Sequence, residues 1–278
     1  MPKFFICTRF NIVTSGPGQQ ADRSGSPTGT VEWLAHRFDL FEKICLPSVM
    51  GQTDQDLVWF VFFSDRTPEP FLSRIREIEA SYPPFKAVFL QDGEKQVRRY
   101  RSEVARSLTP ADTHVITTRL DNDDALHKTY VQRMRAEFHG QDDEVVNFLN
   151  GVQYEMEAGI VVSLRKKSNP FIGRIEKVRN GQVDTVLGVM HYEAEEKCVL
   201  RDVDDPCPVW LQLIHSGNLL NRLNSSRIRL DLDLEREFAI EGHHIHKFRS
   251  IAHFLEERLL NRPWRRIKGA AGRLMRIK

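Results

Sequence analysis

The run Leu57-Val58-Trp59-Phe60-Val61-Phe62-Phe63 decides the fold class, because every one of its residues is apolar. A strand with one face in water alternates polar and apolar residues, whereas a strand that is covered on both faces is apolar throughout. The polar turn Ser64-Asp65-Arg66-Thr67-Pro68 follows at once. We therefore predict that residues 57–63 form a central strand of a parallel sheet.

Strand-like and helical segments alternate on both sides of this run. Before it, the apolar run at 4–8 leads into a loop at 14–30 that is rich in Gly, Ser, Thr and Pro, and then into a helix that we expect Pro47 to close. After it, the pattern predicts a helix at 69–80, a strand at 87–90, a helix at 94–108 and a strand at 113–120. These repeats predict an open α/β sheet, which binds ligands beyond the carboxyl ends of its strands.

The second half of the chain has a different pattern. Short apolar runs at 145–149, 151–156 and 160–164 are separated by turns, which is typical of antiparallel strands. A helix is expected at 130–138, a further strand at 209–215, and mainly helix from residue 235 onward. We predict a main domain over residues 1–230 and a helical extension over 231–278.

Composition excludes several classes of protein. The 278 residues include 40 Lys+Arg and 38 Asp+Glu, and this net charge of +2 does not indicate a nucleic-acid binder. The four cysteines, Cys7, Cys45, Cys198 and Cys207, contain no Cys-x-x-Cys pair, which indicates reduced thiols in a cytoplasmic protein rather than a zinc ribbon. No window approaches the roughly twenty apolar residues of a membrane span.

Acidic residues gather where the strand at 113–120 ends. Asp121, Asn122, Asp123 and Asp124 follow one another there. Adjacent carboxylates repel, so they need either full solvation or a bound cation, and oxygen ligands suit Mg²⁺ or Mn²⁺. A solvated turn, with Asp124 capping a helix that starts near His127, is the alternative. The residues alone leave both interpretations open.

Several stretches together resemble the putative rhamnosyltransferase family. The resemblance covers roughly residues 4–222 and implies a GT-A glycosyltransferase fold for 1–230. The stretches that carry it are Thr8-Arg9-Phe10-Asn11, Phe41…Cys45-Leu46-Pro47-Ser48-Val49…Gln52-Thr53, Thr67-Pro68, Arg119-Leu120-Asp121-Asn122-Asp123-Asp124-Ala125-Leu126 and Trp210-Leu211-Gln212…His215-Ser216-Gly217-Asn218.

The resemblance implies a metal site. Asp121 and Asp123 match the DxD motif, which in GT-A enzymes holds the divalent cation, Mn²⁺ or Mg²⁺, that bridges the donor diphosphate. Asp121 is assigned to the metal or to the ribose. His215 matches a late metal-ligand histidine of such enzymes, although a histidine that is hydrogen-bonded at a strand end is equally consistent with its position.

The resemblance also implies a nucleotide edge. Thr8 and Arg9 end the first strand and Asp65 ends the second, where this fold contacts the nucleotide base or ribose. An Asx turn before Thr67 explains Asp65 equally well. Arg119 either pairs with the donor diphosphate or neutralises the carboxylates beside it.

An inverting transferase needs a carboxylate that takes the proton of the acceptor hydroxyl. Asp205 is the first candidate and Asp204 the second, because they precede the strand at 209–215. Glu176 and Glu193 are further candidates, and an acidic surface turn would also explain Asp204 and Asp205.

The C-terminal segment 258–278 has eight basic and no acidic residues, interleaved with apolar ones. Such a segment can lie on an anionic membrane, pack on the domain or remain unfolded. We expect a cytoplasmic glycosyltransferase, peripheral on the inner face of the membrane, that moves a sugar, rhamnose by the family's name, from a nucleoside-diphosphate donor to a glycan or lipid-linked acceptor. The alternatives are a metal-dependent phosphohydrolase and a non-catalytic protein of this fold that binds glycans or membranes.

Overall fold

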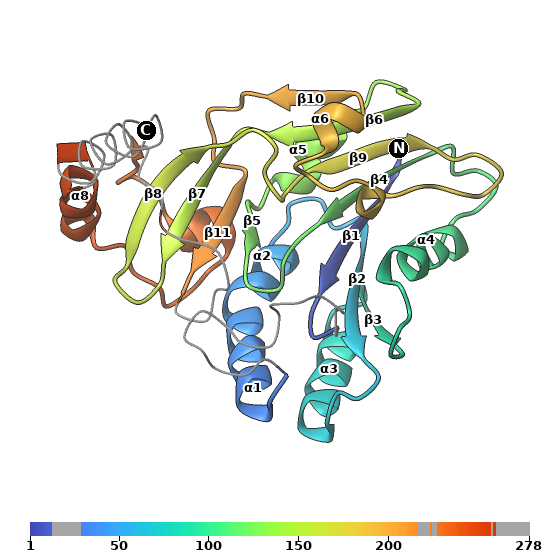
Figure 1. Cartoon of the computed structure of the whole chain (residues 1–278), viewed down its shortest axis with the longest axis horizontal. Helices are drawn as coiled ribbons and strands as arrows, with labels where there is room; N and C mark the ends of the chain where they lie inside the picture. The colour runs from blue at the N-terminus through green and yellow to red at the C-terminus, as the bar shows by residue number, and fades with distance from the viewer. Residues whose placement is uncertain (13–28, 216–222, 224–226, 257, 260–278) are drawn as a thin grey trace, which may run out of the picture.

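The computed structural model describes residues 1–12, 29–215, 223, 227–256 and 258–259. They form two sheets with helices packed around them (Figure 1). The seven-stranded sheet has the order β10 (Leu200–Val203), β6 (Asp143–Phe148), β9 (Gly173–Lys177), β4 (His114–Arg119), β1 (Lys3–Arg9), β2 (Leu57–Ser64) and β3 (Phe85–Leu90). The five-stranded sheet has the order β12 (Arg227–Ile228), β8 (Ile160–Arg165), β7 (Asn150–Glu155), β11 (Trp210–Ile214) and β5 (Ala125–Leu126).

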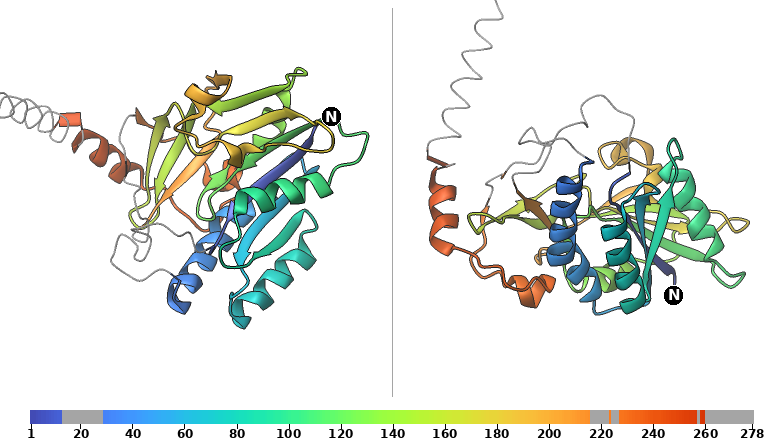
Figure 2. Two further views of the ribbon diagram at one scale, coloured as in Figure 1. Left: turned by 45° about the vertical axis from the view of Figure 1, so that its right-hand side comes forward. Right: turned by 90° about the horizontal axis from the view of Figure 1, so that it is seen from below.

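The helices alternate with the strands in the first half of the chain and are scattered in the second. They are α1 (Val31–Leu40), a π-helical turn (Phe41–Cys45), α2 (Leu46–Met50), α3 (Glu69–Ser81), α4 (Gln96–Arg106), α5 (Tyr130–Ala136), a 3₁₀ turn (Val186–Gly188), α6 (Ala194–Lys197), α7 (Leu234–Phe238) and α8 (Lys247–Glu256). Figure 2 shows α8 beside the five-stranded sheet, away from α1 and α3. No helix of the described segments is long and apolar enough to cross a membrane.

The predicted α/β class, with a mostly parallel sheet flanked by helices, is confirmed. β2 pairs in parallel with β1 and β3, and β1 pairs in parallel with β4. β9 is the exception, since it runs antiparallel to both β4 and β6. The carboxyl ends of β1, β2 and β4 therefore meet at one edge of the sheet.

The apolar run of β2 is covered on both faces, as predicted. Trp59, Val61 and Phe63 pack in one core together with apolar side chains of α1 and α3. Phe60 and Phe62 point to the opposite face and pack in a second core with α4. Burying a side chain of this size stabilises the fold by roughly 2 kcal/mol, so β2 anchors the sheet from both sides.

Pro47 does not close the first helix, and that prediction is wrong. The helix continues through the π-helical turn and ends at Met50. Pro47 stands in the first turn of α2, where a residue without a backbone N–H is tolerated. The carbonyl of Pro47 accepts the N–H of Gly51 at 2.8 Å, and Gly51 is the residue that caps the end of the helix.

The second half builds the smaller sheet. β7 and β8 pair antiparallel as predicted, whereas β6 joins the larger sheet between β10 and β9. Leu234 and Phe238 of α7 share a core with Val152 of β7 and Leu211 of β11. The division of the chain at residue 230 stays a prediction. Helix is observed after residue 230 at α7 and α8, and residues 260–278 lie outside the described residues.

Gly151 tests how tightly the smaller sheet is packed. Gly151 pairs with Trp210, and a Cβ at this glycine would lie 2.1 Å from Cδ2 of the indole. The indole cannot move away easily, because it stacks on Phe171 at 4.9 Å and donates to the carbonyl of Phe148 at 2.8 Å. We expect Gly151→Ala to lower the free energy of unfolding, measured in urea, by about 1–3 kcal/mol through overpacking.

Gly188→Ala is the matched control for this measurement. Its new Cβ would meet the terminal nitrogen of the Arg101 side chain at 3.0 Å, and that flexible group can shift. A Gly151→Ala protein as stable as Gly188→Ala would contradict the close packing of Trp210.

Candidate functional site

Helix α1 carries Arg37 to the acidic cluster. The helix begins after Thr30, whose hydroxyl accepts the backbone N–H of Trp33 at 3.2 Å, a standard way to satisfy a free donor of the first turn. Leu34 and Phe38 anchor α1 in the core. This anchoring leaves Arg37 facing the loop that follows β4.

Asp123 is held by two cationic or potentially cationic side chains. Its Oδ2 lies 2.9 Å from Nη1 of Arg37 and 3.1 Å from Nε2 of His215. Arg37 also donates to the amide oxygen of Asn122. Burial alone would raise the pKa of Asp123, but the charge of Arg37 and the bond with His215 outweigh it and hold the pKa below its usual range. The carboxylate is therefore ionised at neutral pH.

Asp124 performs a structural task. Its Oδ1 accepts the backbone N–H of Leu213 at 2.9 Å, which ties the acidic loop to β11. Burial, followed by the charges of Asp123 and Asp121, raises the pKa of Asp124 well above its usual value. The alternative in which Asp124 caps the next helix is wrong, because α5 begins after Thr129.

The acidic cluster is not a solvated turn. Asn122, Asp123 and Asp124 are only 1%, 7% and 3% exposed. The side chain of Asp121 is 39% exposed and lies 3.4 Å from Nη2 of Arg119, which favours the interpretation that Arg119 neutralises its neighbour. Burial of ionised groups at this density requires paired charges, and Arg37 supplies one.

His215 reaches the cluster through strand pairing. β11 runs antiparallel to β5, with Leu211 opposite Ala125. This register places the residues after β11 beside the acidic loop that precedes β5. The buried imidazole of His215 also lies edge-to-face with His36 of α1, at a centroid distance of 5.5 Å.

Asp123 and His215 fit a divalent cation, and Asp121 lies apart from them. Adjacent ligands of an octahedral ion with bonds of about 2.1 Å are roughly 3.0 Å apart, and the two ligand atoms here are separated by 3.1 Å. The ligand atoms of Asp121, Asp123 and His215 do not all lie within 4.8 Å of one another.

The predicted nucleotide edge is built from residues with different surroundings. Thr8 is fully buried and its hydroxyl accepts the indole N–H of Trp59 at 2.8 Å, which is a packing contact. Arg9 and Asp65 are exposed at the ends of β1 and β2. Their contact with a nucleotide stays a prediction.

Two polar residues at this edge were not assigned a role from the sequence. Asn11 accepts the N–H of Ser64 at 3.0 Å and donates to the hydroxyl of Thr67 at 3.1 Å, so it ties together the loops after β1 and β2. A single asparagine in a loop, such as Asn11, forms no sequence pattern from which this bridge between the two loops could be predicted.

His191 is the second of these residues and follows the 3₁₀ turn. Its Nδ1 is buried with no hydrogen-bond partner among the described residues. Burial, followed by the charges of Arg119 and Lys166, lowers the pKa of His191 to about 4, and the charge of Asp121 acts in the opposite direction. The neutral imidazole therefore lies within electrostatic reach of the acidic cluster.

The structure does not bring Asp204 and Asp205 to Asp123. Both precede β11, whereas His215 follows it, and the five residues of the strand span roughly 17 Å. Asp205 pairs with Arg133 and accepts the N–H of Cys207 at 2.9 Å. These contacts fit a structural turn, so the geometry argues against the predicted role as catalytic base.

The other three candidate bases also have structural partners. Asp204 accepts the amide of Asn150 at 2.7 Å and pairs with Arg165 at 3.1 Å. Glu176 accepts the backbone N–H groups of Asp184 and Thr185 at 2.9 and 2.8 Å. Glu193 pairs with Lys197 at 2.8 Å on the surface.

Comparison with known proteins gives a family and a set of distant structures. The family model described as putative rhamnosyl transferase matches residues 5–222. No curated protein matches the chain. Among solved structures, S. aureus TarS 1-349 is similar with a TM-score of 0.42 at 9% identity, over 76% of this chain and 60% of that chain.

Two further solved structures show the same level of similarity. The complex of TarS 1-349 with UDP-GlcNAc has a TM-score of 0.43 at 9% identity, over 78% of this chain and 60% of that chain. The putative nucleotide-diphospho-sugar transferase from Desulfovibrio desulfuricans G20 has a TM-score of 0.34 at 9% identity, over 74% of this chain and 81% of that chain. The chain thus spans 60% of the length of TarS 1-349.

Removal of Arg37 tests how the acidic cluster is held. We expect Arg37→Ala to lower the free energy of unfolding in urea by about 3 kcal/mol, because the buried Asp123 and Asn122 lose this donor. Arg76→Ala is the control. Arg76 pairs with Glu69, and the two side chains are 66% and 70% exposed. Such a surface pair contributes little. Equal effects of the two substitutions would show that Arg37 does not stabilise the cluster.

Proposed function

The chain belongs to the putative rhamnosyl transferase family, and on this premise we propose that it transfers a sugar from a nucleoside-diphosphate donor to a glycan or lipid-linked acceptor. Membership of this family supports glycosyl transfer as the activity, and the family's name suggests rhamnose as the sugar. The matched region, 5–222, includes every residue of the buried cluster around Asp123. That cluster, at the carboxyl edge of β4, is the observation that carries the proposal.

Asp123 and His215 are proposed to hold a divalent cation, Mn²⁺ or Mg²⁺. Such an ion would stabilise the negative charge that develops on the diphosphate leaving group. Arg37 keeps the Asp123 carboxylate ionised through one donor and holds the neighbouring Asn122 through a second. The half-exposed Asp121 lies apart from this pair and is proposed to contact the ribose from the solvent side.

The nucleotide is proposed to lie over the carboxyl ends of β1 and β2. Arg9 and Asp65 are exposed there, so their side chains can contact a ligand. Thr8 acts beneath them by fixing Trp59. Asn11 holds the two loops together, which keeps the edge in one shape for a ligand.

A thermal-shift screen of nucleoside diphosphates, with and without Mn²⁺, tests this function. We expect one nucleotide to raise the Tm only when Mn²⁺ is present, since a ligand at about 100 times its Kd stabilises the folded state by about 2.7 kcal/mol. Asp123→Asn should abolish the metal-dependent shift. Asp124→Asn should retain it, because the amide oxygen can still accept the N–H of Leu213.

The outcomes of the screen are distinct. If no nucleotide gives a metal-dependent shift, the transferase proposal fails. If Asp123→Asn responds like the unchanged protein, the metal lies elsewhere. Release of inorganic phosphate from the bound nucleotide would favour the phosphohydrolase alternative.

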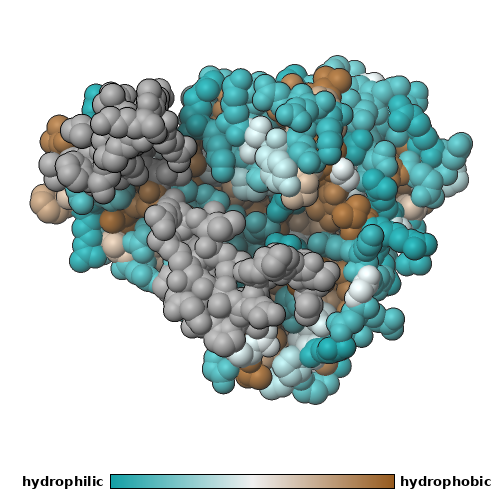
Figure 3. All heavy atoms as spheres, viewed as in Figure 1, coloured by the Kyte–Doolittle hydropathy of each residue, from teal (hydrophilic) through white to brown (hydrophobic). Residues whose placement is uncertain are grey.

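We also propose that the C-terminal end contacts an anionic membrane. Phe248 and Leu255 of α8 are 82% and 46% exposed, and Leu259 is 65% exposed. Figure 3 shows apolar atoms at the left edge of the molecule, where Figure 1 places α8. The basic segment 258–278, of which only 258–259 are described, continues from this helix. An apolar face next to basic residues suits a membrane surface.

Sedimentation with phosphatidylglycerol vesicles tests this contact. Each basic residue near an anionic surface contributes on the order of 1 kcal/mol, so a chain that ends at Glu257 should bind at least about tenfold more weakly than the whole chain. Phe248→Ser should weaken binding without changing the charge. Equal binding of whole and shortened chains, or equal binding to neutral phosphatidylcholine vesicles, would contradict the proposal.

A further inference from the structure

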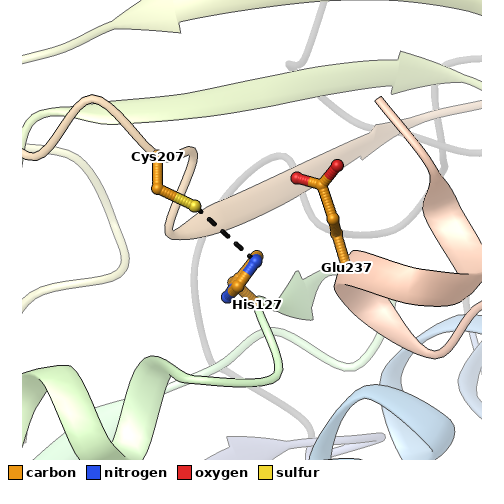
Figure 4. Close-up of side chains that lie close together, drawn as sticks. All are labelled: His127, Cys207 and Glu237. Carbon is orange, nitrogen blue, oxygen red and sulfur yellow. Dashed lines mark hydrogen bonds between the residues drawn. The ribbon is translucent and has the colours of Figure 1, made fainter. Parts of the chain in front are cut away.

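Three potential metal ligands from separate parts of the chain meet at the start of β11. His127 follows β5, Cys207 lies in the turn before β11, and Glu237 is on α7. One ligand atom from each of these residues lies within 4.8 Å of the other two. Figure 4 shows the three side chains converging from three different segments.

The spacing and the atom types fit zinc. A tetrahedral zinc ion with a Zn–N bond of about 2.0 Å and a Zn–S bond of about 2.3 Å holds these two ligand atoms about 3.5 Å apart. Nε2 of His127 lies 3.6 Å from Sγ of Cys207. Nitrogen, sulfur and carboxylate oxygen together are a donor set that zinc prefers.

The surroundings of His127 orient its ring toward Cys207. Nδ1 accepts the backbone N–H of Thr129 at 3.2 Å and lies 2.8 Å from the hydroxyl of that residue. These contacts hold the ring with Nε2 facing the sulfur. A metal at Nε2 therefore requires the ring proton to lie on Nδ1, where the hydroxyl oxygen of Thr129 can accept it. Phe238 packs edge-to-face on the ring at 5.5 Å. Burial, followed by the charges of Arg133 and Lys128, lowers the pKa of His127 to about 4, so the imidazole is neutral at neutral pH.

The carboxylate of Glu237 is buried, and its contacts with the described residues are long. Oε1 lies 3.3 Å from the backbone N of Asp233 and 3.5 Å from Nη2 of Arg236, and Oε2 lies 3.9 Å from Nη2 of Arg229. Glu237 is 7% exposed. Hydrogen bonds at these distances are weak, so a cation would improve the electrostatic environment of this group.

We propose that His127, Cys207 and Glu237 bind a zinc ion, with water in the fourth position. The ion fastens α7 and the turn before β11 to the residue that follows β5. Burial raises the pKa of the Cys207 thiol, so binding at neutral pH releases its proton to solvent as the thiolate–zinc bond forms. The site lies at the opposite end of β11 from His215 and does not depend on the proposed transferase chemistry.

Cobalt substitution distinguishes this site from every other metal site of the chain. The whole protein is freed of metal with a chelator and titrated with Co²⁺, whose thiolate charge-transfer band in the near ultraviolet appears only when sulfur is a ligand. We expect this band at one equivalent, and its displacement by Zn²⁺. Asp123→Asn should keep the band, because the Asp123–His215 pair contains no sulfur.

Matched substitutions assign the ligands. Cys207→Ser should abolish the band, whereas Cys198→Ser should keep it, since Cys198 is also a half-buried free thiol but lies outside the cluster. Glu237→Gln preserves the shape of the side chain and should weaken zinc binding by more than about tenfold. This variant tests the zinc site even if Cys207→Ser does not fold.

The contrary outcomes are equally definite. The Sγ–Nε2 contact of 3.6 Å can also be an ordinary hydrogen bond between thiol and imidazole. Absence of the thiolate band in the unchanged protein would establish that interpretation and overturn the proposal. Persistence of the band in Cys207→Ser, or unchanged zinc affinity in Glu237→Gln, would overturn it as well.

Discussion

The buried contact between Arg37 and Asp123 is the interaction on which the candidate site depends. A carboxylate that is only 7% exposed cannot stay ionised without a compensating charge, and the guanidinium provides it with a directed hydrogen bond. Because Arg37 also donates to Asn122, it fixes the loop as well as the charge. Helix α1 and strand β4 are thereby locked in one arrangement around the acidic cluster.

The pairing of β5 with β11 lies within the five-stranded sheet, and because β5 follows the acidic loop after β4, it brings this sheet to the cluster. Only two residue pairs form this contact, Trp210 with Leu126 and Leu211 with Ala125. The bond from the N–H of Leu213 to Asp124 extends it to the acidic loop. A short antiparallel contact therefore brings His215 to an acidic loop that lies about ninety residues earlier in the chain.

Sequence patterns could predict whatever depends on local periodicity. The apolar runs of β1 and β2, the helix α3 and the acidic loop after β4 all lie where they were predicted. The strands could be predicted because a strand that is buried on both faces is apolar throughout. The predicted helix end at Pro47 was wrong, because a π-helical turn precedes this residue and the helix there tolerates a residue without a backbone N–H. Asp205 was predicted as a catalytic base because it lies close to His215 in the sequence. In the structure the extended strand β11 separates the two residues.

The remaining features depend on contacts that no local pattern encodes. Asn11, His191 and the group of His127, Cys207 and Glu237 each stand alone in their own segment, so nothing in the sequence links them. Their partners are chosen by the sheet topology. A search for spaced ligand motifs therefore finds the acidic loop and overlooks a cluster assembled from three separate segments.

The π-helical turn between α1 and α2 sets the rotational phase of the site. There the N–H of Leu46 bonds to the carbonyl of Phe41, one residue farther back than in an α-helix. A residue in an α-helix turns about 100° relative to the one before it, so this extra residue rotates α1 by roughly that angle against a continuous helix. Loss of a single residue from 41–45 would swing Arg37 toward a different side of the molecule while leaving its sequence neighbours unchanged.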